Sequence, residues 1–227
     1  MPSILAAGFA AGYEMTNVRR FGWRLSLVWR RRVGETGCMI VHWLWVVLYW
    51  AWILTEIYVA VVTRTRRGGG EIQDRGSLIV LWVTIFCAMF FGSWLGAVYQ
   101  PTMFHAPHWL RFVCLGLLAV GLAIRLTAIY TLGKSFSANV AIHSTQKLNQ
   151  SGLFRWMRHP SYTGVLMIFL GVGLDTHNWL GLAIIVLLPM AALLYRIHVE
   201  EDALAGAFGE EYVEYSQRTK RLIPGVY

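Results

Sequence analysis

Long apolar runs alternate with short polar segments along most of the chain. Three of these runs, about 38–62, 78–99 and 109–132, each reach the roughly 20 residues that a helix needs to cross the hydrocarbon core of a bilayer. A fourth apolar stretch, about 160–196, is interrupted by the polar residues Asp175 to Asn178, and such a cluster is typical of a turn. The pattern predicts membrane helices with a tight reversal within the last stretch.

We interpret the fourth stretch as a helical hairpin with arms at 160–174 and 179–196. The first arm has about 15 residues, which is short for a full span, so we expect it to be tilted or shielded by its neighbours. After Arg196 the sequence becomes polar and amphipathic, which predicts a helix that leaves the membrane and runs to about Arg218, before Pro224. The expected architecture is all-α and polytopic, with five transmembrane helices and a cytosolic C-terminal helix.

Lysine and arginine are distributed unevenly among the polar segments. They occur in 63–77, in 133–159 and in the C-terminal tail, whereas 100–108 and 175–178 have none. Because basic loops remain in the cytosol, this alternation predicts that the first three segments are cytosolic and that the N-terminus is outside. Six arginines before the first helix favour a cytosolic N-terminus instead: Arg19, Arg20, Arg24, Arg30, Arg31 and Arg32.

The chain divides into a basic N-terminal segment, 1–37, and a single membrane domain, 38–227. One interpretation of residues 15–34 is an amphipathic helix that lies on the membrane surface. We find no internal repeat and no linker within 38–227 that would mark a second domain.

The composition agrees with a membrane protein. Of the 227 residues, 56% are hydrophobic and 14% charged, against about 25% charged in an average soluble domain, and the mean hydropathy is +0.50. The formal charge of +8 is explained by the basic loops, and no nucleic-acid-binding motif is present. The three cysteines have no CxxC spacing, so neither a disulfide framework nor a zinc site is indicated, and we expect no metal.

Charged and small residues within the apolar runs call for a structural or functional explanation. Glu56 and Arg125 lie about two turns from a helix end, so Glu56 is expected to reach the interface, while Arg125 has either a structural partner or a role near a cytosolic site. Gly92 and Gly96 form a GxxxG pattern, which predicts close packing of helices within or between chains.

Two polar clusters carry the candidate chemistry. The first is GLFRWMRHPSYTG at 152–164, and the second begins with Arg196, Glu200, Glu201 and Asp202 and continues with FGEEY at 208–212. Each has an ordinary explanation, since proline and basic residues suit a cytosolic helix start and an Arg–Glu pair four apart suits a helix surface. The predicted hairpin would return both clusters to the same side of the membrane, beside 133–159.

The order and spacing of these clusters resemble the isoprenylcysteine carboxyl methyltransferase family, whose wider relatives include phospholipid N-methyltransferases. The resemblance covers about 115–227 and runs through LGKSFS at 132–137, Ile142-His143, GLFRWMRHPSYTG, Arg196 to Glu201 and FGEEYVEYSQRTKRLIP. It implies a methyltransferase that uses S-adenosylmethionine on the cytosolic side, has no Rossmann domain and holds the cofactor within about 133–227.

The resemblance also implies roles for single residues. Arg196 would face the carboxylate of the substrate. The cofactor-binding residues would be His143, Gln146, Lys147, Leu148, Asn149, Phe154, His159, Pro160, Ser161, Tyr162 and Glu200. Three of these positions depart from the family pattern, because Phe154 replaces a frequent tyrosine, Asn149 a valine and His143 a frequent glutamine.

The reaction that the resemblance implies suits these residues. A carboxylate acceptor is already ionised at pH 7, so its methylation needs neither a metal nor a strong base. Arg196 could bind such a carboxylate with two parallel hydrogen bonds. The implied acceptor is a prenylcysteine-type carboxylate, or another lipophilic substrate, reached from the membrane lipids.

Three other functions remain open at this point. An N- or S-methyltransferase acting on a phospholipid or another lipophilic acceptor would need a base such as His143 or Glu201. A sterol-reductase-like enzyme that uses NADPH and a non-enzymatic membrane protein are more distant alternatives. A carboxylate acceptor predicts activity that persists down to about pH 5–6, whereas an amine acceptor does not.

Overall fold

The computed structural model describes residues 39–61, 71–72, 76–133, 136, 141–142 and 147–227, so the predicted N-terminal segment 1–37 lies outside the described residues. Internal contacts separate Met1–Val46 from Val47–Tyr227. The described part of the first unit is the start of a helix, Met39–Val61, and every contact discussed below lies within the second unit.

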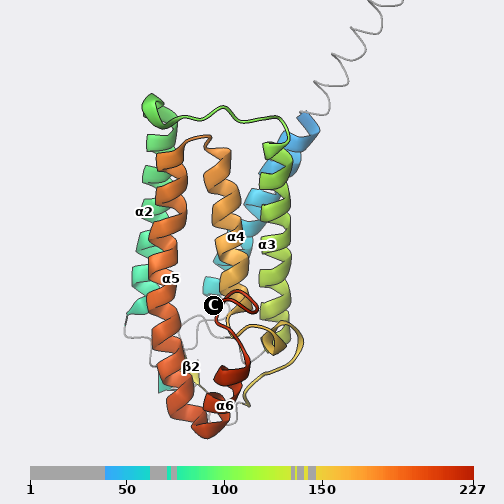
Figure 1. Cartoon of the computed structure of the whole chain (residues 1–227), viewed down its shortest axis with the longest axis vertical. Helices are drawn as coiled ribbons and strands as arrows, with labels where there is room; N and C mark the ends of the chain where they lie inside the picture. The colour runs from blue at the N-terminus through green and yellow to red at the C-terminus, as the bar shows by residue number, and fades with distance from the viewer. Residues whose placement is uncertain (1–38, 62–70, 73–75, 134–135, 137–140, 143–146) are drawn as a thin grey trace, which may run out of the picture. The chain divides into compact units, whose positions relative to one another are not determined.

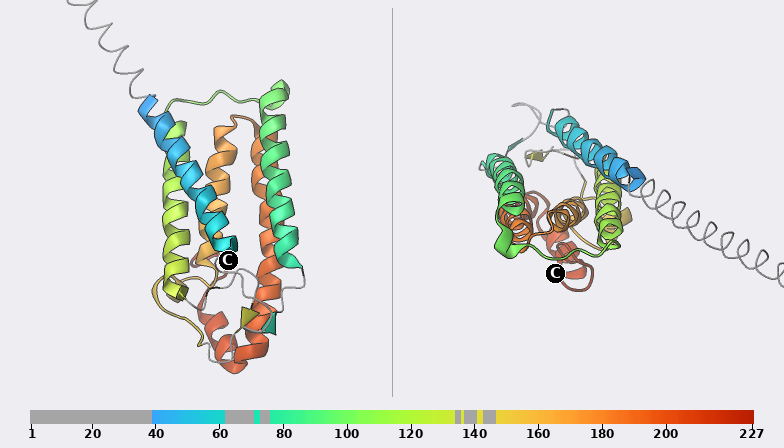
Figure 2. Two further views of the ribbon diagram at one scale, coloured as in Figure 1. Left: turned by 180° about the vertical axis from the view of Figure 1, so that it is seen from behind. Right: turned by 90° about the horizontal axis from the view of Figure 1, so that it is seen from above.

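The elements that follow this helix are nearly all helical. In chain order they are β1 (Glu71–Ile72), α2 (Ser77–Val98), η1 (Gln100–Thr102), α3 (Leu110–Leu132), β2 (Ala141–Ile142), η3 (Gly152–Arg155), α4 (Pro160–Asp175), α5 (Trp179–Phe208) and α6 (Glu210–Arg218). The helices α2, α3, α4 and α5 lie side by side (Figures 1 and 2), and β1 and β2 form a short antiparallel ladder in which Glu71 pairs with Ile142.

Four of the described helices are long and apolar enough to cross a membrane: Met39–Val61, α2, α3 and α5. The apolar helix α4 has 16 residues and is the shorter arm of the predicted hairpin. The described helices expose many large apolar side chains, such as Phe86, Phe90 and Trp94 on α2, which suit contact with lipid tails. The protein is therefore an integral membrane protein with a helical membrane fold.

The predicted hairpin turn is present at Thr176–Asn178. Asn178 caps the N-terminus of α5, because its side-chain oxygen accepts hydrogen bonds from the backbone amides of Leu180 and Gly181. His177 has a φ of 51°, which completes the sharp reversal between the two helices.

The structure corrects the predicted end of the last helix. We expected one helix from about Arg196 to about Arg218, but α5 continues unbroken to Phe208 and a separate helix, α6, starts at Glu210. Gly209 stands between them with a φ of 54°, a backbone conformation that other residues rarely adopt. The break directs α6 back toward the start of α4 (Figure 1).

Glycines allow the helices to approach closely. A Cβ atom at Gly121 of α3 would lie 2.6 Å from the backbone oxygen of Gly164 on α4. The predicted GxxxG contact is made within the chain, since Gly92 and Gly96 of α2 face Ile185, Gly181 and Thr176 on the other side of the interface. Helix pairs α3–α4 and α2–α5 therefore pack with little space between their backbones.

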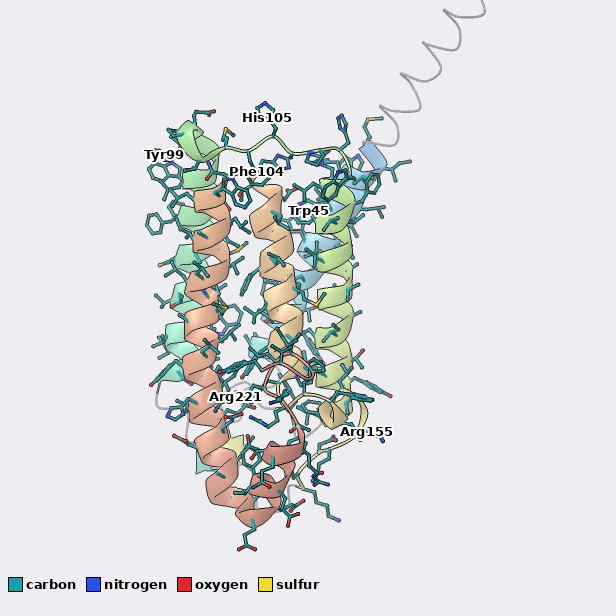
Figure 3. The ribbon with its side chains drawn as sticks, viewed as in Figure 1. Trp45, Tyr99, Phe104, His105, Arg155 and Arg221 are labelled. Carbon is teal, nitrogen blue, oxygen red and sulfur yellow. The ribbon has the colours of Figure 1, made fainter. Side chains whose placement is uncertain are left out.

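The two loops without basic residues meet at one end of the helices. Phe104 donates its amide to the His177 carbonyl at 3.0 Å, and Asn178 donates its side-chain amide to the Tyr99 carbonyl at 2.8 Å. Tyr99, Phe104 and His105 mark this end in Figure 3, whereas Arg155 and Arg221 lie toward the other end. The two ends thus differ in charge as the sequence predicts.

Candidate functional site

The two polar clusters of the sequence meet at the basic end of the helices. Tyr162, in the first turn of α4, donates its phenol hydrogen to Glu200 Oε2 of α5 at 2.7 Å. The same hydroxyl accepts a hydrogen bond from Arg196 Nε at 3.1 Å. Because Arg196 and Glu200 are four residues apart on one helix, a single tyrosine contacts both.

A cavity with a volume of about 170 Å³ opens beside this contact. By the same measure one water molecule needs about 10–15 Å³, so the cavity has room for a much larger ligand. Ten of the residues predicted to form the site line it: Lys147, Leu148, Asn149, Phe154, His159, Pro160, Ser161, Tyr162, Arg196 and Glu200. His143 and Gln146 lie outside the described residues.

The lining changes character along the cavity. Most of its polar groups come from the start of α4, from α5 and from α6, and the buried residues Glu56 and Arg125 add a second charged group to the lining. Its apolar groups come mainly from the helix Met39–Val61, from α2 and from the middle of α4, and include Trp52, Leu81, Trp82, Ile85, Val165 and Phe169. A ligand with one polar end and one apolar end would match both parts.

Ion pairs hold the polar wall together around Glu201. Its Oε1 accepts from Arg158 Nε at 2.9 Å and lies 3.3 Å from His159 Nε2. Its Oε2 accepts from Arg221 Nε at 2.9 Å. The hydrogen bond to Glu201, together with one to the Tyr227 hydroxyl, raises the pKa of the Arg221 guanidinium above its usual range. Both oxygens of Glu201 are therefore engaged in binding the segments around α4.

The residues Lys220–Tyr227, here called the C-terminal strap, fix the start of α4. Backbone amides of Arg158 and His159 donate to the carbonyls of Lys220 and Arg221 at 2.7 and 2.9 Å. The Thr163 hydroxyl donates to the carbonyl of Leu222 at 2.8 Å. The strap thus positions the RHPSY segment, whose side chains line the cavity.

His159 lies between two carboxylates in this arrangement. Its ring stacks on Tyr162 with centroids 5.5 Å apart, and its Nδ1 is 3.7 Å from Glu200 Oε2. Only 4% of its surface is exposed, so the ring is a fixed part of the wall.

The segment 147–155 lines part of the cavity and is held in place by local hydrogen bonds. Asn149 donates to the Thr131 carbonyl at 3.0 Å and accepts from the Ser151 amide at 2.9 Å, so its side chain fastens this loop to the end of α3. Phe154 is buried, and its carbonyl accepts a hydrogen bond from Tyr215 at 2.7 Å. Two of the three departures from the family pattern, Asn149 and Phe154, are therefore accommodated by local hydrogen bonds and packing.

A buried charge cluster that the predicted site omits lies on the same cavity. Glu56 does not reach the interface as expected, because Arg125 Nη2 donates to its Oε2 at 2.6 Å and only 9% of Glu56 is exposed. Arg125 Nη1 also donates to the Ser161 hydroxyl at 2.7 Å. Arg125 thus has both a structural partner and a place at the site. The sequence signal was two opposite charges within apolar runs.

Two tyrosines of α6 complete the wall, and the sequence reasoning did not select them. Tyr212 and Tyr215 are both buried and line the cavity. Burial raises the pKa of Tyr215 to about 12 and, together with the charge of Glu201, raises that of Tyr212. Both phenols are therefore neutral at physiological pH. The signal available in the sequence was their spacing in FGEEYVEY, because two residues about one helical turn apart lie on the same face of a helix.

Comparisons with known proteins find relatives for about half of the chain. Residues 114–206 match the model of the family described as "Isoprenylcysteine carboxyl methyltransferase (ICMT) family". Protein-S-isoprenylcysteine O-methyltransferase B of Arabidopsis thaliana is 33% identical over 120 residues, which are 52% of this chain and 61% of that protein. The enzyme of Tribolium castaneum named protein-S-isoprenylcysteine O-methyltransferase is 30% identical over 145 residues, 63% of this chain and 48% of that protein.

A solved structure is similar as well. It is titled as the eukaryotic intramembrane Ras methyltransferase ICMT (isoprenylcysteine carboxyl methyltransferase) without a monobody, and it matches with a TM-score of 0.50 and 30% sequence identity over 66% of this chain and 51% of that chain. The chain spans about half to three fifths of the length of the relatives it matches. The resemblance seen in the sequence is confirmed: residues 114–206, with most of the candidate site, are related to the isoprenylcysteine carboxyl methyltransferase family.

Proposed function

We propose that this protein transfers a methyl group from S-adenosylmethionine to the carboxylate of a prenylcysteine-type acceptor held in the membrane. One observation carries the proposal: a single cavity joins the polar cluster around Tyr162, Arg196 and Glu200 to an apolar wall containing Trp52 and Phe169. A prenylated carboxylic acid has this same division between a charged head and an apolar tail. The methyltransferase relatives support the reaction class.

The polar wall fits a methyl donor of this kind. The side chain of Glu200 is 31% exposed, and among the described residues its Oε1 has no hydrogen-bond partner. A carboxylate oxygen in that state can accept hydrogen bonds from hydroxyl or ammonium groups, which S-adenosylmethionine carries. His159, Pro160, Ser161 and Phe154 would surround it with the loop 147–149. When bound, S-adenosylmethionine supplies an electrophilic methyl group attached to a positively charged sulfur.

Arg196 is the residue that we assign to the acceptor carboxylate. Its guanidinium is buried and oriented by two hydroxyl groups, Tyr162 at 3.1 Å and Ser77 at 2.8 Å. Arg125 also lies at the cavity, where it pairs with Glu56. A guanidinium fixed in this way can hold one carboxylate oxygen toward the methyl donor with little further reorganisation.

Acid–base chemistry contributes little to this reaction. A carboxylate needs no deprotonation at neutral pH, so the chain has only to position it and to exclude water. Glu201, which could have served as a base for an amine or thiol acceptor, has both oxygens engaged by arginines. The occupied state of Glu201 favours the carboxylate acceptor.

The apolar part of the cavity, which includes Trp52 and Phe169, would bind the lipid tail of an acceptor that enters from the bilayer. Its walls come from the helix Met39–Val61 and from α2, whose outer faces carry exposed apolar side chains. We further propose that α4 is a fifth, tilted membrane helix and that the basic end of the bundle, with the cavity and α6, faces the cytosol. The positive charge of that end supports this orientation.

The test is incubation of the detergent-solubilised protein with labelled S-adenosylmethionine and an N-acylated S-farnesylcysteine. We expect a base-labile label, as a methyl ester gives, and no transfer to the matching carboxamide. Transfer to the carboxamide, or to phospholipid amines in a base-stable form, would contradict the proposed acceptor. No transfer to any lipid fraction would contradict the methyltransferase function.

Two variants separate the donor site from the acceptor site. Glu200→Gln should weaken the binding of S-adenosylhomocysteine in a calorimetric titration by about tenfold or more, because a charged hydrogen-bond acceptor is lost. Arg196→Lys should retain that affinity but lower turnover, because lysine cannot bind a carboxylate with two parallel hydrogen bonds. Equal loss of both properties in Arg196→Lys would assign this arginine a structural or cofactor-binding role.

A further inference from the structure

Tyr212 carries a buried polar group that no other described residue satisfies. Only 5% of the residue is exposed, and its hydroxyl has no hydrogen-bond partner among the described residues. An unsatisfied buried hydroxyl costs about 1–3 kcal/mol, and such groups are uncommon in native proteins. The position therefore calls for an explanation.

The neighbouring tyrosine shows that the fold can satisfy a phenol in this helix. Tyr215, one turn further along α6, is equally buried and donates its hydroxyl hydrogen to the Phe154 carbonyl at 2.7 Å. The ring of Tyr212 packs on that of Tyr215 with centroids 6.2 Å apart, so packing needs the ring but not the hydroxyl. Phenylalanine would fill the same space without the cost.

The location of Tyr212 indicates what its hydroxyl meets. Tyr212 lines the same cavity as Glu200, His159 and Phe154, and the charges of Glu201, Arg158 and Glu200 act on its phenol. Tyr212 thus belongs to the lining of the cavity, and its buried hydroxyl lies within the electrostatic influence of the charged groups around Glu200. A ligand in this cavity would bring polar atoms close to a hydroxyl that has no partner among the described residues.

We propose that the hydroxyl of Tyr212 forms a hydrogen bond with the bound methyl donor, which makes α6 part of the donor site. This inference rests on the proposed function. It extends the site beyond residues 114–206, the range that matches the family, to a helix that follows the break at Gly209. The unsatisfied state of the ligand-free protein would then be relieved on binding.

The test compares Tyr212→Phe with two other tyrosine variants in the detergent-solubilised full chain. Calorimetric titration with S-adenosylhomocysteine should show affinity about fivefold weaker for Tyr212→Phe, as expected for the loss of one neutral hydrogen bond. Tyr130→Phe removes an exposed phenol of α3 outside the cavity and should bind as the unaltered protein does. Tyr215→Phe serves as the reference for loss of a satisfied structural hydrogen bond.

Thermal unfolding without ligand gives the second measurement. Tyr212→Phe should keep or raise the melting temperature, because it removes an unsatisfied group, whereas Tyr215→Phe should lower it. Unchanged affinity in Tyr212→Phe, or a fall in its ligand-free melting temperature like that of Tyr215→Phe, would overturn the inference. If the unaltered protein binds no S-adenosylhomocysteine, the proposed function itself fails, and the role of Tyr212 fails with it.

Discussion

At the scale of single residues, one phenol connects the two charged groups with the most specific proposed roles. Tyr162 donates to Glu200 and accepts from Arg196, while its ring stacks on His159. A hydroxyl that donates one hydrogen bond and accepts another fixes the separation of its two partners more tightly than either hydrogen bond alone. Tyr162 would therefore set the distance between the donor site and the acceptor carboxylate.

This role predicts the behaviour of Tyr162→Phe. The ring and its stacking remain, but both hydrogen bonds to charged groups are lost, so turnover should fall about ten- to hundredfold. Steady-state methyl transfer, measured with donor and acceptor varied separately, checks the expectation. Tyr195→Phe on α5 removes an exposed phenol outside the cavity and is the matched control; equal rates in the two variants would contradict the role.

At the scale of the elements, the close contact of α3 and α4 brings Arg125 and Ser161 within hydrogen-bonding distance of each other. Gly121 and Gly164 face each other across this interface, and a Cβ atom at Gly164 would lie 2.5 Å from the Gly121 carbonyl oxygen. Ser161 precedes Gly164 by one helical turn, so the separation of the helices at the glycines controls the Arg125–Ser161 hydrogen bond.

Gly121→Ala should therefore disturb both stability and the site. The added methyl group meets backbone atoms, which can give way only if the helices move apart, and overpacking of this kind costs about 1–3 kcal/mol. Gly116→Ala on the same helix is the control, because a Cβ atom there has no neighbour within 4 Å. Thermal unfolding in detergent should show a lower melting temperature for Gly121→Ala alone. Similar values for both variants would mean that the interface tolerates the extra volume.

At the scale of the whole molecule, the C-terminal strap connects the start of α4 to α5. It contacts the start of α4 through backbone carbonyls, and its Arg221 binds Glu201 of α5. The segment that follows the last helix therefore holds together two helices that line the cavity. A few hydrogen bonds at the site thus join the C-terminal strap to the start of α4, which is about 60 residues earlier in the sequence.

Removal of residues 220–227 should thus impair ligand binding before it unfolds the helices. Without the strap, the backbone amides of Arg158 and His159 lose their partners and the RHPSY segment loses its anchor. We expect affinity for S-adenosylhomocysteine to fall at least about tenfold, while circular dichroism shows retained helix. Lys220→Ala, which keeps the backbone carbonyl and changes only an exposed side chain, should bind normally. Normal binding by the truncated chain would show that the strap has no positioning role.

The sequence determined the features that depend on local pattern. Apolar runs of sufficient length predicted the membrane helices, and the polar cluster at Asp175–Asn178 predicted the hairpin turn, because burial in lipid and chain reversal are properties of short segments. The RHPSY and Arg196-to-Glu201 clusters also identified most of the residues that line the cavity. Their order along the chain was sufficient for the family resemblance.

Only the tertiary structure decided which distant groups meet. No local pattern pairs Glu56 with Arg125, 69 residues away. Nor does a local pattern explain why the hydroxyl of Tyr215 has a partner while that of Tyr212 has none among the described residues. The glycine at the break, Gly209, was visible in the sequence, but the direction of α6 depends on its contacts with the segment before α4, such as the hydrogen bond from Tyr215 to Phe154. Side-chain partners across a membrane bundle are chosen by the fit of whole helices, and that fit is a property of the folded chain.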